Sequence, residues 1–379
     1  MKNTNKKIKI AIISDAIYPY NKGGKEKRIY EITTRLANKD YDVHIYCMKW
    51  WSGQKKIKIQ NKITLHAISN LYPLYSGQRR SIKQAILFSL SCFKLLKEDF
   101  DVIEVDHMPH LVLFSTKIVA LLKRKKLHAT WNEVWGKSYW KEYLGRLGTL
   151  AYCIEWLSSR LPDRIIAVSE HTKNKLITDL KIKKPITVIP NGIDINLISQ
   201  IKTAKEKSDV VFTGRLLKHK NVDVLIKSIK LLKKDFPNVQ AFIIGEGPEK
   251  QNLQLLTKKL DLEKNIKFFG LLKTYTETYA LMKSSKVFAF PTTREGFGIV
   301  VLEANAAGIP VITTNHPNNA AKHLIKNNQN GQIIDLNEKE LANSIKKYLK
   351  NSKVSNDYTK IIKKFDWDNI TQKIKETYV

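Results

Sequence analysis

Residues 287–314 read VFAFPTTREGFGIVVLEANAAGIPVITT, and this stretch shows the unit from which the rest of the chain is built. The apolar run VFAF ends at a proline and is typical of a buried strand, and TTREGFG follows it as a glycine-containing loop. IVVLEANAAG then has the composition of a helix, and IPVITT is a second apolar strand. This succession predicts parallel strands covered by helices on both faces of a sheet.

The same alternation runs along the whole chain. Strand candidates in the first half are KIKIAIIS, YDVHIYCM, FDVIEV and RIIAVS, and the second half adds DVVFTG, VQAFIIG and NIKFFG. The pattern restarts near residue 208, after a polar stretch without periodicity. The sequence therefore predicts an α/β protein with two Rossmann-like, doubly wound domains, 1–190 and 208–360, joined by a linker at 191–207.

Size and composition fit two ordinary globular domains. The chain has 379 residues, of which 43% are hydrophobic and 27% charged. The start of the chain lacks the apolar run of a signal peptide, and no stretch approaches the roughly 20 apolar residues of a membrane span. Cys47, Cys92 and Cys153 lie far apart, with neither disulfide-framework nor metal-ligand spacing, so a reducing cytoplasm is expected.

The chain is strongly basic, with a formal net charge of +31. Residues 1–190 contain 35 basic and 16 acidic residues, a net charge of +19, which leaves +12 for residues 191–379. Nucleic acid, an anionic membrane surface and general lysine enrichment can each explain such a charge. Because no nucleic-acid-binding motif accompanies it, we do not expect a nucleic-acid partner.

Two carboxylates, Glu295 and Glu303, stand out in the apolar opening stretch. Glycines let the loop backbone approach a ligand, and the N-terminus of the following helix favours a phosphate. A carboxylate on an apolar helix is costly unless donors bond to it, and the diol of a sugar or ribose supplies two donors. A nucleotide sugar satisfies all three features. The alternative is that Glu295 caps the helix or pairs with Arg294, while Glu303 faces solvent.

Other strand-end loops carry related chemistry. In GRLLKHKN, residues 214–221, Gly214 permits a turn, and Arg215 and Lys220 can hold a diphosphate and stabilise it as it leaves, unless they are simply solvated. Gly23 and Gly24 separate a strand from a helix and can cradle an anion, although such a pair is a weak signal by itself. The glycine pair in GEGP, residues 245–248, is similar.

Taken together, these motifs resemble the retaining glycosyltransferases of family four, which have the GT-B fold. The most specific match is Glu295 followed by seven residues and then Glu303. The other matches run in the family's order along nearly the whole chain: Gly23-Gly24, VIPNGID at 188–194, GRLLKHKN, GEGP and FFG at 268–270. The resemblance implies two domains that face each other across a cleft. It also implies a last helix, within residues 361–379, that crosses back to the first domain.

The resemblance implies a role for each matched residue. Glu303 would bind the donor ribose, Glu295 the hydroxyls of the donor sugar, and Arg215 and Lys220 the diphosphate. The donor-binding residues are expected to be Gly23, Gly24, Gly214, Arg215, Lys220, Glu295, Gly296, Phe297, Gly298, Ile299, Val300 and Glu303. No metal or other cofactor would be needed. The transfer would retain configuration: the acceptor attacks the face that the diphosphate leaves, and the leaving phosphate acts as the base.

The catalytic residues are expected among Glu295, Arg215, Lys220, His107 and Asp106. Relatives in the family often carry a histidine near the transferred carbon, after the strand that reads DVIEV here. Asp106 occupies that position, with His107 next and His110 beyond, so either of the first two residues can serve, or neither. Asn132 stands where many relatives have another histidine. The roles on the acceptor side therefore stay open.

Four other functions compete with this interpretation. A metal-dependent transferase would need an Asp-x-Asp at a strand end, but DWD at 366–368 precedes a helical pattern and is better explained by helix capping. A glycosidase could use the two carboxylates. A sugar-nucleotide epimerase of the same fold would need no acceptor. An inactive protein could use the same basic cleft to bind nucleic acid, with a steep salt dependence.

The acceptor is expected to be a glycan or a lipid-linked intermediate of envelope polysaccharide or lipopolysaccharide synthesis, and the donor a UDP-sugar, with GDP and ADP as alternatives. KRKK at 123–126 and the basic amphipathic stretch 79–97 could lie on the inner face of the cytoplasmic membrane. An ordinary surface helix and a packed aromatic core explain the same residues equally well. The aromatic cluster in question comprises Trp131, Trp135, Tyr139, Trp140 and Tyr143.

Overall fold

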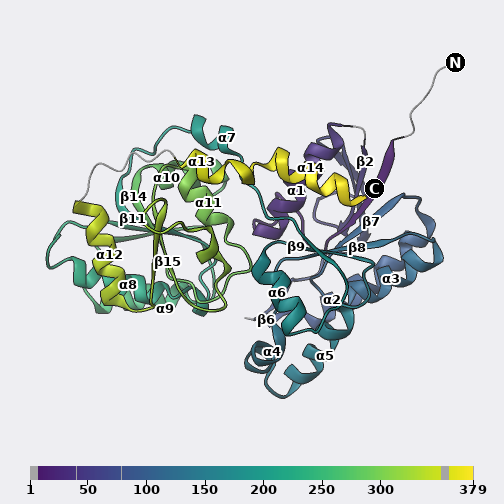
Figure 1. The fold of residues 1–379 in the computed structure, drawn as a ribbon, viewed down its shortest axis with the longest axis horizontal. Coiled ribbons are helices and arrows are strands. Elements are labelled where there is room, and N and C mark those ends of the chain that lie inside the picture. Colours follow the sequence, from purple (N-terminus) through teal and green to yellow (C-terminus); the bar gives the residue numbers. More distant parts are fainter. Residues whose placement is uncertain (1–6, 40, 78, 351–357, 379) are drawn as a thin grey trace. The chain divides into compact units, whose positions relative to one another are not determined.

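A computed structural model describes residues 7–39, 41–77, 79–350 and 358–378. The chain divides into two compact units (Figure 1). The first unit contains Met1–Asn191 and Trp367–Val379, and the second contains Gly192–Asp366. Each unit has its own sheet, and each is described by itself below.

The first unit is built on an eight-stranded sheet whose strands follow the order β10-β9-β8-β7-β1-β2-β4-β3. All neighbouring strands pair in parallel, except β3 and β4, which pair antiparallel at one edge. The central strands are buried along most of their length, as their apolar sequences predict. The strands are β1 (Ile8–Ile13), β2 (Tyr41–Met48), β3 (Ile57–Gln60), β4 (Ile63–Ser69), β7 (Val102–Asp106), β8 (Leu127–Trp131), β9 (Arg164–Ala167) and β10 (Ile186–Val188).

One face of this sheet is covered by α1 (Gly24–Ala37) and by the last helix of the chain, α14 (Trp367–Tyr378). Trp367, Ile370 and Ile374 project from α14 into a core that also contains Ile32 and Leu36 of α1. These apolar residues recur at intervals of three and four positions, so they form one stripe on each helix. The burial of that stripe explains why the end of the chain groups with the first unit.

The opposite face is covered by a second helical layer with its own core. Phe88, Cys92, Val119 and Leu176 are among the fully buried members of this core. The layer contains α2 (Ile82–Ser91), the 3-10 helix η1 (Cys92–Lys97), α3 (Val112–Leu122), α4 (Gly136–Leu144), η2 (Gly145–Leu147), α5 (Gly148–Ser158) and α6 (Glu170–Thr178). A two-stranded hairpin, β5 (Tyr75–Ser76) and β6 (Arg79–Arg80), precedes α2.

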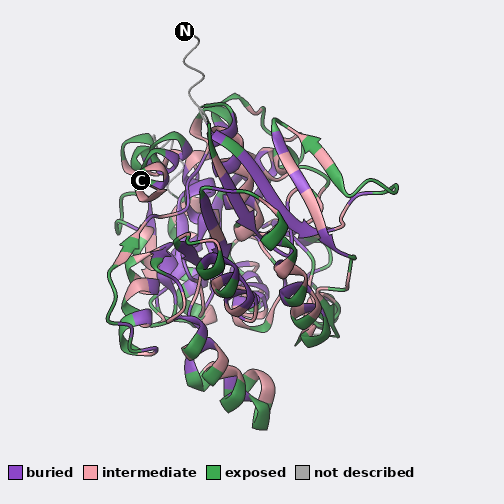
Figure 2. Ribbon diagram, turned by 90° about the vertical axis from the view of Figure 1, so that its right-hand side faces the viewer, coloured by how far each residue is buried: buried purple, intermediate pink, exposed green. Residues whose placement is uncertain are grey.

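The second unit is built on a six-stranded sheet of order β13-β12-β11-β14-β15-β16, and every pairing in it is parallel. The strands are mostly buried and the helices expose their outer turns, which is the pattern that Figure 2 shows for the sheet and helices of the first unit. The strands are β11 (Ser208–Thr213), β12 (Ala241–Ile244), β13 (Ile266–Gly270), β14 (Ser285–Phe290), β15 (Val311–Thr314) and β16 (Gly331–Ile334). The prediction of parallel sheets in two domains is thus confirmed.

The helices of the second unit pack on both faces of its sheet. In α8, for example, Leu225, Ile226 and Ile229 are fully buried, at the spacing that sets one helix face against a core. The segments are α7 (Ile195–Gln200), η3 (Lys218–Lys220), α8 (Val222–Leu232), α9 (Lys250–Lys259), α10 (Tyr275–Lys283), α11 (Ile299–Ala306), η4 (Ala320–Leu324), α12 (Glu338–Lys350), α13 (Thr359–Ile362) and η5 (Lys363–Phe365).

The structure corrects the expected linker at 191–207. Its middle forms α7, which begins at the side-chain cap of Asp194, and Lys283 of α10 donates hydrogen bonds to the carbonyls of Ile198, Ser199 and Ile201. The stretch therefore belongs to the second unit, although its sequence lacks an apolar period. The final segment also begins later than predicted, since residues 361–366 remain in the second unit. Among the described residues, none of the helices combines the length and hydropathy of a membrane span.

Candidate active site

The N-terminus of α11 follows directly from the end of β14. Gly298 precedes the helix with a left-handed backbone, φ +93°, and no side chain caps the first turn. A Cβ on Gly298 would lie 2.6 Å from Cβ of Ala321, so both the backbone angle and the close approach require glycine. The first backbone amides of α11 therefore lie where an anion can accept hydrogen bonds from them.

Glu295, in the loop between β14 and α11, is held at both its backbone and its side chain. Its amide donates to the carbonyl of Asn318 at 3.0 Å, and its own carbonyl accepts from Ala320 at 2.9 Å. Its carboxylate accepts a 2.5 Å hydrogen bond from Nζ of Lys220, which forms an ion pair that is mostly shielded from solvent. The sequence offered Arg294 as a partner of Glu295, and the structure pairs Glu295 with Lys220 of another loop.

Lys220 ends η3, in the loop after β11, and its ammonium group lies 4.9 Å from the centre of the Phe290 ring. Asn221 follows in a left-handed conformation and donates to the carbonyl of Pro291 at 2.9 Å. The amide of Thr293 donates to the carbonyl of His219 at 2.9 Å. Because β11 and β14 are neighbours in the sheet, these bonds join their two loops into one surface.

The same surface carries a positive electrostatic potential. Burial, followed by the charges of Lys220, Arg294 and Arg215, lowers the pKa of His219 to about 2. Three cations therefore lie close enough to act on one imidazole, and that imidazole is neutral at physiological pH. This concentration of positive charge beside the N-terminus of α11 suits a diphosphate.

Glu303, in the middle of α11, is only 5% exposed, and its Oε1 accepts a 2.9 Å hydrogen bond from the hydroxyl of Tyr279 in α10. The alternative that Glu303 faces solvent is therefore wrong. A buried carboxylate has more acceptor capacity than one phenol can satisfy. A carboxylate at this position is an acceptor for hydroxyl groups, as its bond from Tyr279 shows.

The glycines of GEGP serve mainly to pack one loop against another. A Cβ on Gly245 would lie 2.0 Å from the carbonyl oxygen of Gly214, and one on Gly247 would lie 2.3 Å from that of Leu216. The amide of Leu216 donates to the carbonyl of Glu246 at 2.9 Å. These contacts fix the backbone between Gly214 and Leu216, and so they determine where the exposed side chain of Arg215 begins.

The remaining predicted donor residues of the second unit lie in the same loop and helix turn. Gly296, Phe297 and Ile299 are buried, and Val300 is half-buried. The Phe297 ring packs edge-on against Phe365, with 5.9 Å between the centroids. The second unit thus brings together every donor residue that was predicted for it, at the carboxyl ends of β11 and β14.

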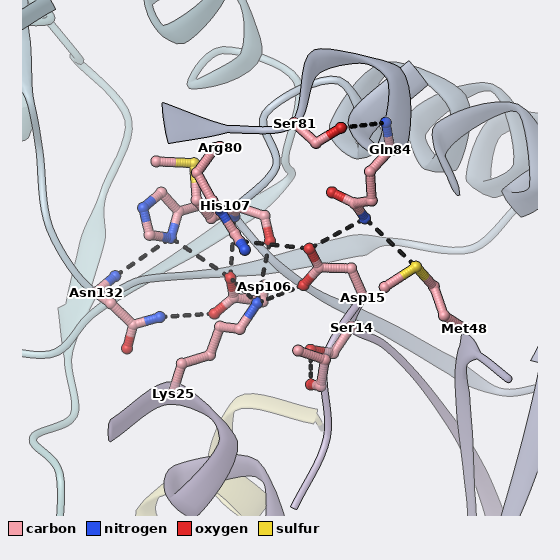
Figure 3. Close-up of polar contacts among 12 residues, drawn as sticks. Ser14, Asp15, Lys25, Met48, Arg80, Ser81, Gln84, Asp106, His107 and Asn132 are labelled. Atoms are coloured by element: carbon pink, nitrogen blue, oxygen red, sulfur yellow. Dashed lines mark hydrogen bonds and ion pairs between the residues drawn. The ribbon is translucent and has the colours of Figure 1, made fainter. Parts of the chain in front are cut away.

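The first unit contains a second polar cluster, at the carboxyl end of β1 (Figure 3). Asp15 is fully buried there and accepts from Nζ of Lys25 at 2.7 Å, from Arg80 at 3.3 Å and from Gln84 at 3.3 Å. Burial alone would raise the pKa of Asp15, but Lys25 and Arg80 more than offset it, so the pKa is lowered. Asp15 is therefore an ionised centre for two cations.

Asp106, at the end of β7, belongs to the same cluster. It accepts hydrogen bonds from the side-chain amide of Asn132 at 2.6 Å and from the amide of Met108 at 3.0 Å, and Nζ of Lys25 lies 3.6 Å away. Burial raises the pKa of Asp106, and Lys25 offsets this only in part. The Asp106 carboxyl group thus keeps its proton to a higher pH than an exposed aspartate does.

His107 is buried against the indole of Trp131, with 5.2 Å between the rings, and its Nδ1 accepts from the amide of Asn132 at 3.4 Å. Burial, assisted by the charge of Lys25, lowers the pKa of His107 to about 3. Burial likewise lowers the pKa of His110, which lies 5.5 Å from the His107 ring. Both imidazoles are therefore neutral, and in this structure neither is open to a ligand. Of the two candidates that the sequence left open, Asp106 is the better placed for chemistry.

Gly23 and Gly24 stand at the start of α1, where Gly23 is the N-terminal cap residue and contributes no side-chain bond. Lys25 follows directly and reaches Asp15 and Asp106. The glycine loop therefore leads directly into the polar cluster of the first unit.

The aromatic cluster of the first unit is partly a packed core. Trp131 and Trp140 are buried, and the indole of Trp140 donates to Glu155 at 2.8 Å. The Trp135 ring packs at 4.5 Å from that of Trp140, and the Tyr143 hydroxyl accepts from the amide of Arg80 at 2.8 Å. These residues thus position α4 and the β6 strand.

The DWD motif is not placed as a metal site. Asp368 accepts from Nε of Arg35 at 2.9 Å, and Asp366 belongs to a backbone bridge with Ile193. The Asp368 carboxylate thus pairs with α1, and among the described residues no group of three or more His, Cys, Asp or Glu side chains could hold a metal ion.

Sequence reasoning did not single out several residues of these clusters. Asp15 and Lys25 flank the glycine loop at the end of β1, which is the signal that could have found them. Arg80, Gln84, Tyr279 and His219 carry no local signal, because only the packing of the helices brings them to their partners.

Comparison with known families gives a consistent result for both units. Residues 22–197 match the family described as glycosyltransferase family 4, and residues 194–365 match glycosyl transferases group 1. An uncharacterized glycosyltransferase of Haemophilus influenzae is 27% identical, over 84% of this chain and 84% of that protein. The capsular polysaccharide biosynthesis glycosyltransferase CapH of Staphylococcus aureus is 25% identical, over 95% of this chain and 96% of that protein.

Solved structures share the fold at lower identity. Sucrose-phosphate synthase from Thermosynechococcus elongatus superposes with a TM-score of 0.78 at 16% identity, covering 98% of each chain. Anabaena HepE in complex with UDP and glucose gives 0.74 at 21% identity, covering 98% of this chain and 99% of that one. The chain belongs to the group 1 glycosyltransferases of family 4, and its fold is GT-B. The predicted family and fold class are confirmed.

We expect Gly298→Ala to lower the free energy of unfolding by about 2–3 kcal/mol, because a side chain there is strained in its backbone and also clashes with Ala321. Urea unfolding followed by circular dichroism measures this. Gly308→Ala is the matched control, since Gly308 also has a positive φ, +82°, but nothing lies within 4 Å of its Cβ. Equal losses in the two variants would contradict the clash.

We expect the first unit to lose stability as the pH falls below about 6.5. His107 has a folded pKa of about 3, so between these values the unfolded chain binds the proton and the folded chain does not. At pH 5 this single group costs about 2 kcal/mol relative to pH 7. Urea unfolding of wild type and His107→Gln at both pH values measures the difference. An identical pH dependence in the two proteins would contradict the assignment.

Proposed function

We propose that the protein transfers a sugar from a UDP-sugar to a glycan or lipid-linked acceptor, with retention of configuration at the transferred carbon. The acceptor would be an intermediate in envelope polysaccharide or glycolipid synthesis. The observation that carries the proposal is the combination, in the second unit, of the Lys220–Glu295 ion pair, the uncapped N-terminus of α11 and the buried carboxylate of Glu303.

Charge supports a diphosphate at this place. Loops 214–221 and 291–298 contain four basic residues and one acidic residue. The basic residues are Arg215, Lys218, Lys220 and Arg294, and the acidic residue is Glu295. A nucleotide diphosphate carries two to three negative charges, which this excess balances together with the partial charge of the helix N-terminus. The Lys220 ammonium can turn from Glu295 toward the diphosphate, and Glu295 then becomes free to accept from the sugar hydroxyls.

The reaction follows from these contacts. The bond between the anomeric carbon and the diphosphate oxygen breaks, and its electron pair stays on the diphosphate. Lys220 and Arg215 stabilise that developing charge. The acceptor oxygen bonds to the same face of the carbon, and its proton passes to the departing phosphate. Glu303 holds the ribose and keeps the nucleotide in place during this exchange.

The relatives support the proposed donor, a UDP-sugar, and the proposed acceptor, an intermediate of polysaccharide or glycolipid synthesis. HepE has been solved with UDP-glucose, and CapH and the Escherichia coli O-antigen biosynthesis glycosyltransferase WclY act in polysaccharide synthesis by their descriptions. WclY is 28% identical over 62% of this chain. The solved structure of WaaG, a glycosyltransferase involved in lipopolysaccharide biosynthesis, has a TM-score of 0.71 at 18% identity.

We further propose that the transfer needs no metal and no other cofactor. In a metal-dependent transferase, the cation neutralises the diphosphate. Here Lys220 and Arg215 supply that charge from positions that the loop packing fixes. On the acceptor side, Lys25 and Asp106 of the first unit are the groups we propose to orient an acceptor hydroxyl, with His107 kept neutral behind them.

We expect a UDP-sugar at a hundred times its dissociation constant to stabilise the wild-type protein by roughly 2.7 kcal/mol. Glu303→Ala should weaken that binding by about tenfold to a hundredfold, because a charged acceptor for the ribose is lost. Thermal unfolding with matched series of UDP-, GDP- and ADP-sugars measures both effects and identifies the base.

Glu263→Ala is the control for that series, because Glu263 is an exposed glutamate of the same unit. It should bind the donor as the wild type does. Stabilisation by no nucleotide sugar, or equal stabilisation of wild type and Glu303→Ala, would contradict the proposed donor site.

A further inference from the structure

The two helical layers of the first unit differ sharply at their outer surfaces. The structure exposes twenty large hydrophobic side chains among its described residues, and ten of them lie on five helices of one layer, α2, η1, α3, η2 and α5. None of the twenty lies on α1 or α14, which cover the other face of the same sheet. The ten are Ile82, Ile86, Leu90, Leu96, Ile118, Leu121, Leu122, Leu147, Leu150 and Leu157.

The spacing on α2 shows that this exposure is organised. Ile82, Ile86 and Leu90 recur every four residues, so they lie along one side of the helix. The other side carries Gln84 and Phe88, which are buried. The helix is therefore apolar on both its inner and its outer side, and only the inner side meets a core. An outer apolar row of this kind has no role in folding the unit.

The helix α3 continues the same surface. It packs beside α2 and η1, and the hydroxyl of Ser89 in α2 bonds to the carbonyl of Leu111 at 2.7 Å and to Ser115 at 3.1 Å. The outward residues Ile118, Leu121 and Leu122 therefore lie in the same layer as the outer row of α2. We call these six residues of α2 and α3 the α2–α3 face.

The segments that form the α2–α3 face are strongly basic, although Lys117 of α3 pairs with Asp163 at 2.6 Å. Residues 79–97 and 111–126, which contain α2, η1 and α3, carry ten basic residues and no acidic residue. The nearest acidic residues in the sequence follow at 98, 99 and 101, and Asp101 pairs with Lys125 at 3.6 Å. The basic residues are Arg79, Arg80, Lys83, Lys94, Lys97, Lys117, Lys123, Arg124, Lys125 and Lys126.

An apolar centre with a predominantly basic surround complements an anionic lipid bilayer. Side chains such as Ile86 and Leu122 can enter the boundary between head groups and acyl chains, while lysine and arginine ends reach lipid phosphates. A protein partner of matching shape would need acidic residues around an apolar patch. A second copy of this chain offers only the same positive charge, which repels it.

We propose that the α2–α3 face docks the protein on the anionic inner leaflet of the cytoplasmic membrane. This sharpens the broader prediction from the sequence, because the aromatic residues of that prediction are largely packed, and the exposed aliphatic side chains of α2 and α3 take their place. The docking itself does not depend on the proposed function. Its role does, because the docked enzyme would meet a lipid-linked acceptor.

The test is co-sedimentation of the full chain with vesicles of phosphatidylglycerol and phosphatidylcholine, or of phosphatidylcholine alone, at low and high salt. The wild type should bind the anionic vesicles, bind much less at high salt and fail to bind neutral ones. Leu90→Ser/Leu122→Ser should weaken binding by about tenfold or more, without any change in net charge.

The matched control is Leu255→Ser/Leu271→Ser in the second unit. Both leucines are 63% exposed, close to the 58% of Leu90 and the 67% of Leu122. The control should bind vesicles as the wild type does. The proposal is overturned if the wild type stays in the supernatant, or if both double variants lose binding equally. A dimer in sedimentation velocity that Leu90→Ser/Leu122→Ser disperses, without vesicle binding, would assign the face to a second copy instead.

Thermal stabilisation by a UDP-sugar separates this proposal from the proposed function. Leu90→Ser/Leu122→Ser should keep the wild-type shift, because the α2–α3 face belongs to the first unit and the proposed donor site to the second. A donor shift without vesicle binding would overturn the docking alone. Vesicle binding without any donor shift would overturn the proposed function alone.

Discussion

The ion pair between Lys220 and Glu295 is the contact on which the candidate donor site depends. It joins the loops that follow two neighbouring strands, β11 and β14, and the bonds of Asn221 and Thr293 reinforce the same junction. A charged pair with little solvent is favourable only while each charge keeps a partner. Glu295 and Lys220 therefore neutralise each other, and a bound diphosphate can take the place of Glu295 beside Lys220 while the sugar hydroxyls bond to Glu295. Glycine at position 298 completes the site, because only that residue lets α11 begin so close to Ala321.

The first unit also pairs a lysine with carboxylates that are shielded from solvent, in this case two buried aspartates. Lys25, one residue beyond the glycine loop, lies between Asp15 and Asp106, whose pKa values move in opposite directions. Burial raises the pKa of both carboxyl groups. Two cations more than offset this rise for Asp15, whereas Lys25 offsets it only in part for Asp106. The result is one fixed negative charge, on Asp15, and one carboxyl group, Asp106, that is protonated at a higher pH than an ordinary aspartate. A pair of carboxyl groups tuned apart in this way is a common basis for acid and base roles at an active site.

The sequence predicted the features that repeat or that lie within one short segment. Alternating strands and helices predicted both sheets, and the segment with Glu295 and Glu303 was predicted as a strand, a loop and a helix because these elements are contiguous. It did not predict α7, since a cap at Asp194 and the three bonds of Lys283 hold a helix that has no apolar period. Nor did it predict Tyr279 beside Glu303 or Arg80 beside Asp15, because packing between distant segments creates those contacts. The burial of His107 was equally invisible, since it depends on the Trp131 ring beside it.

The central claim is that the protein's own cations hold the diphosphate. Titration calorimetry of UDP tests it most directly, with wild type and Lys220→Met, each in EDTA and in excess Mg²⁺. The account predicts the same dissociation constant for the wild type in both buffers. It also predicts binding weakened by about tenfold to a hundredfold in Lys220→Met, because a charged hydrogen bond to phosphate is lost. Wild-type binding that appears only with Mg²⁺, or binding that is unchanged in Lys220→Met, would contradict it.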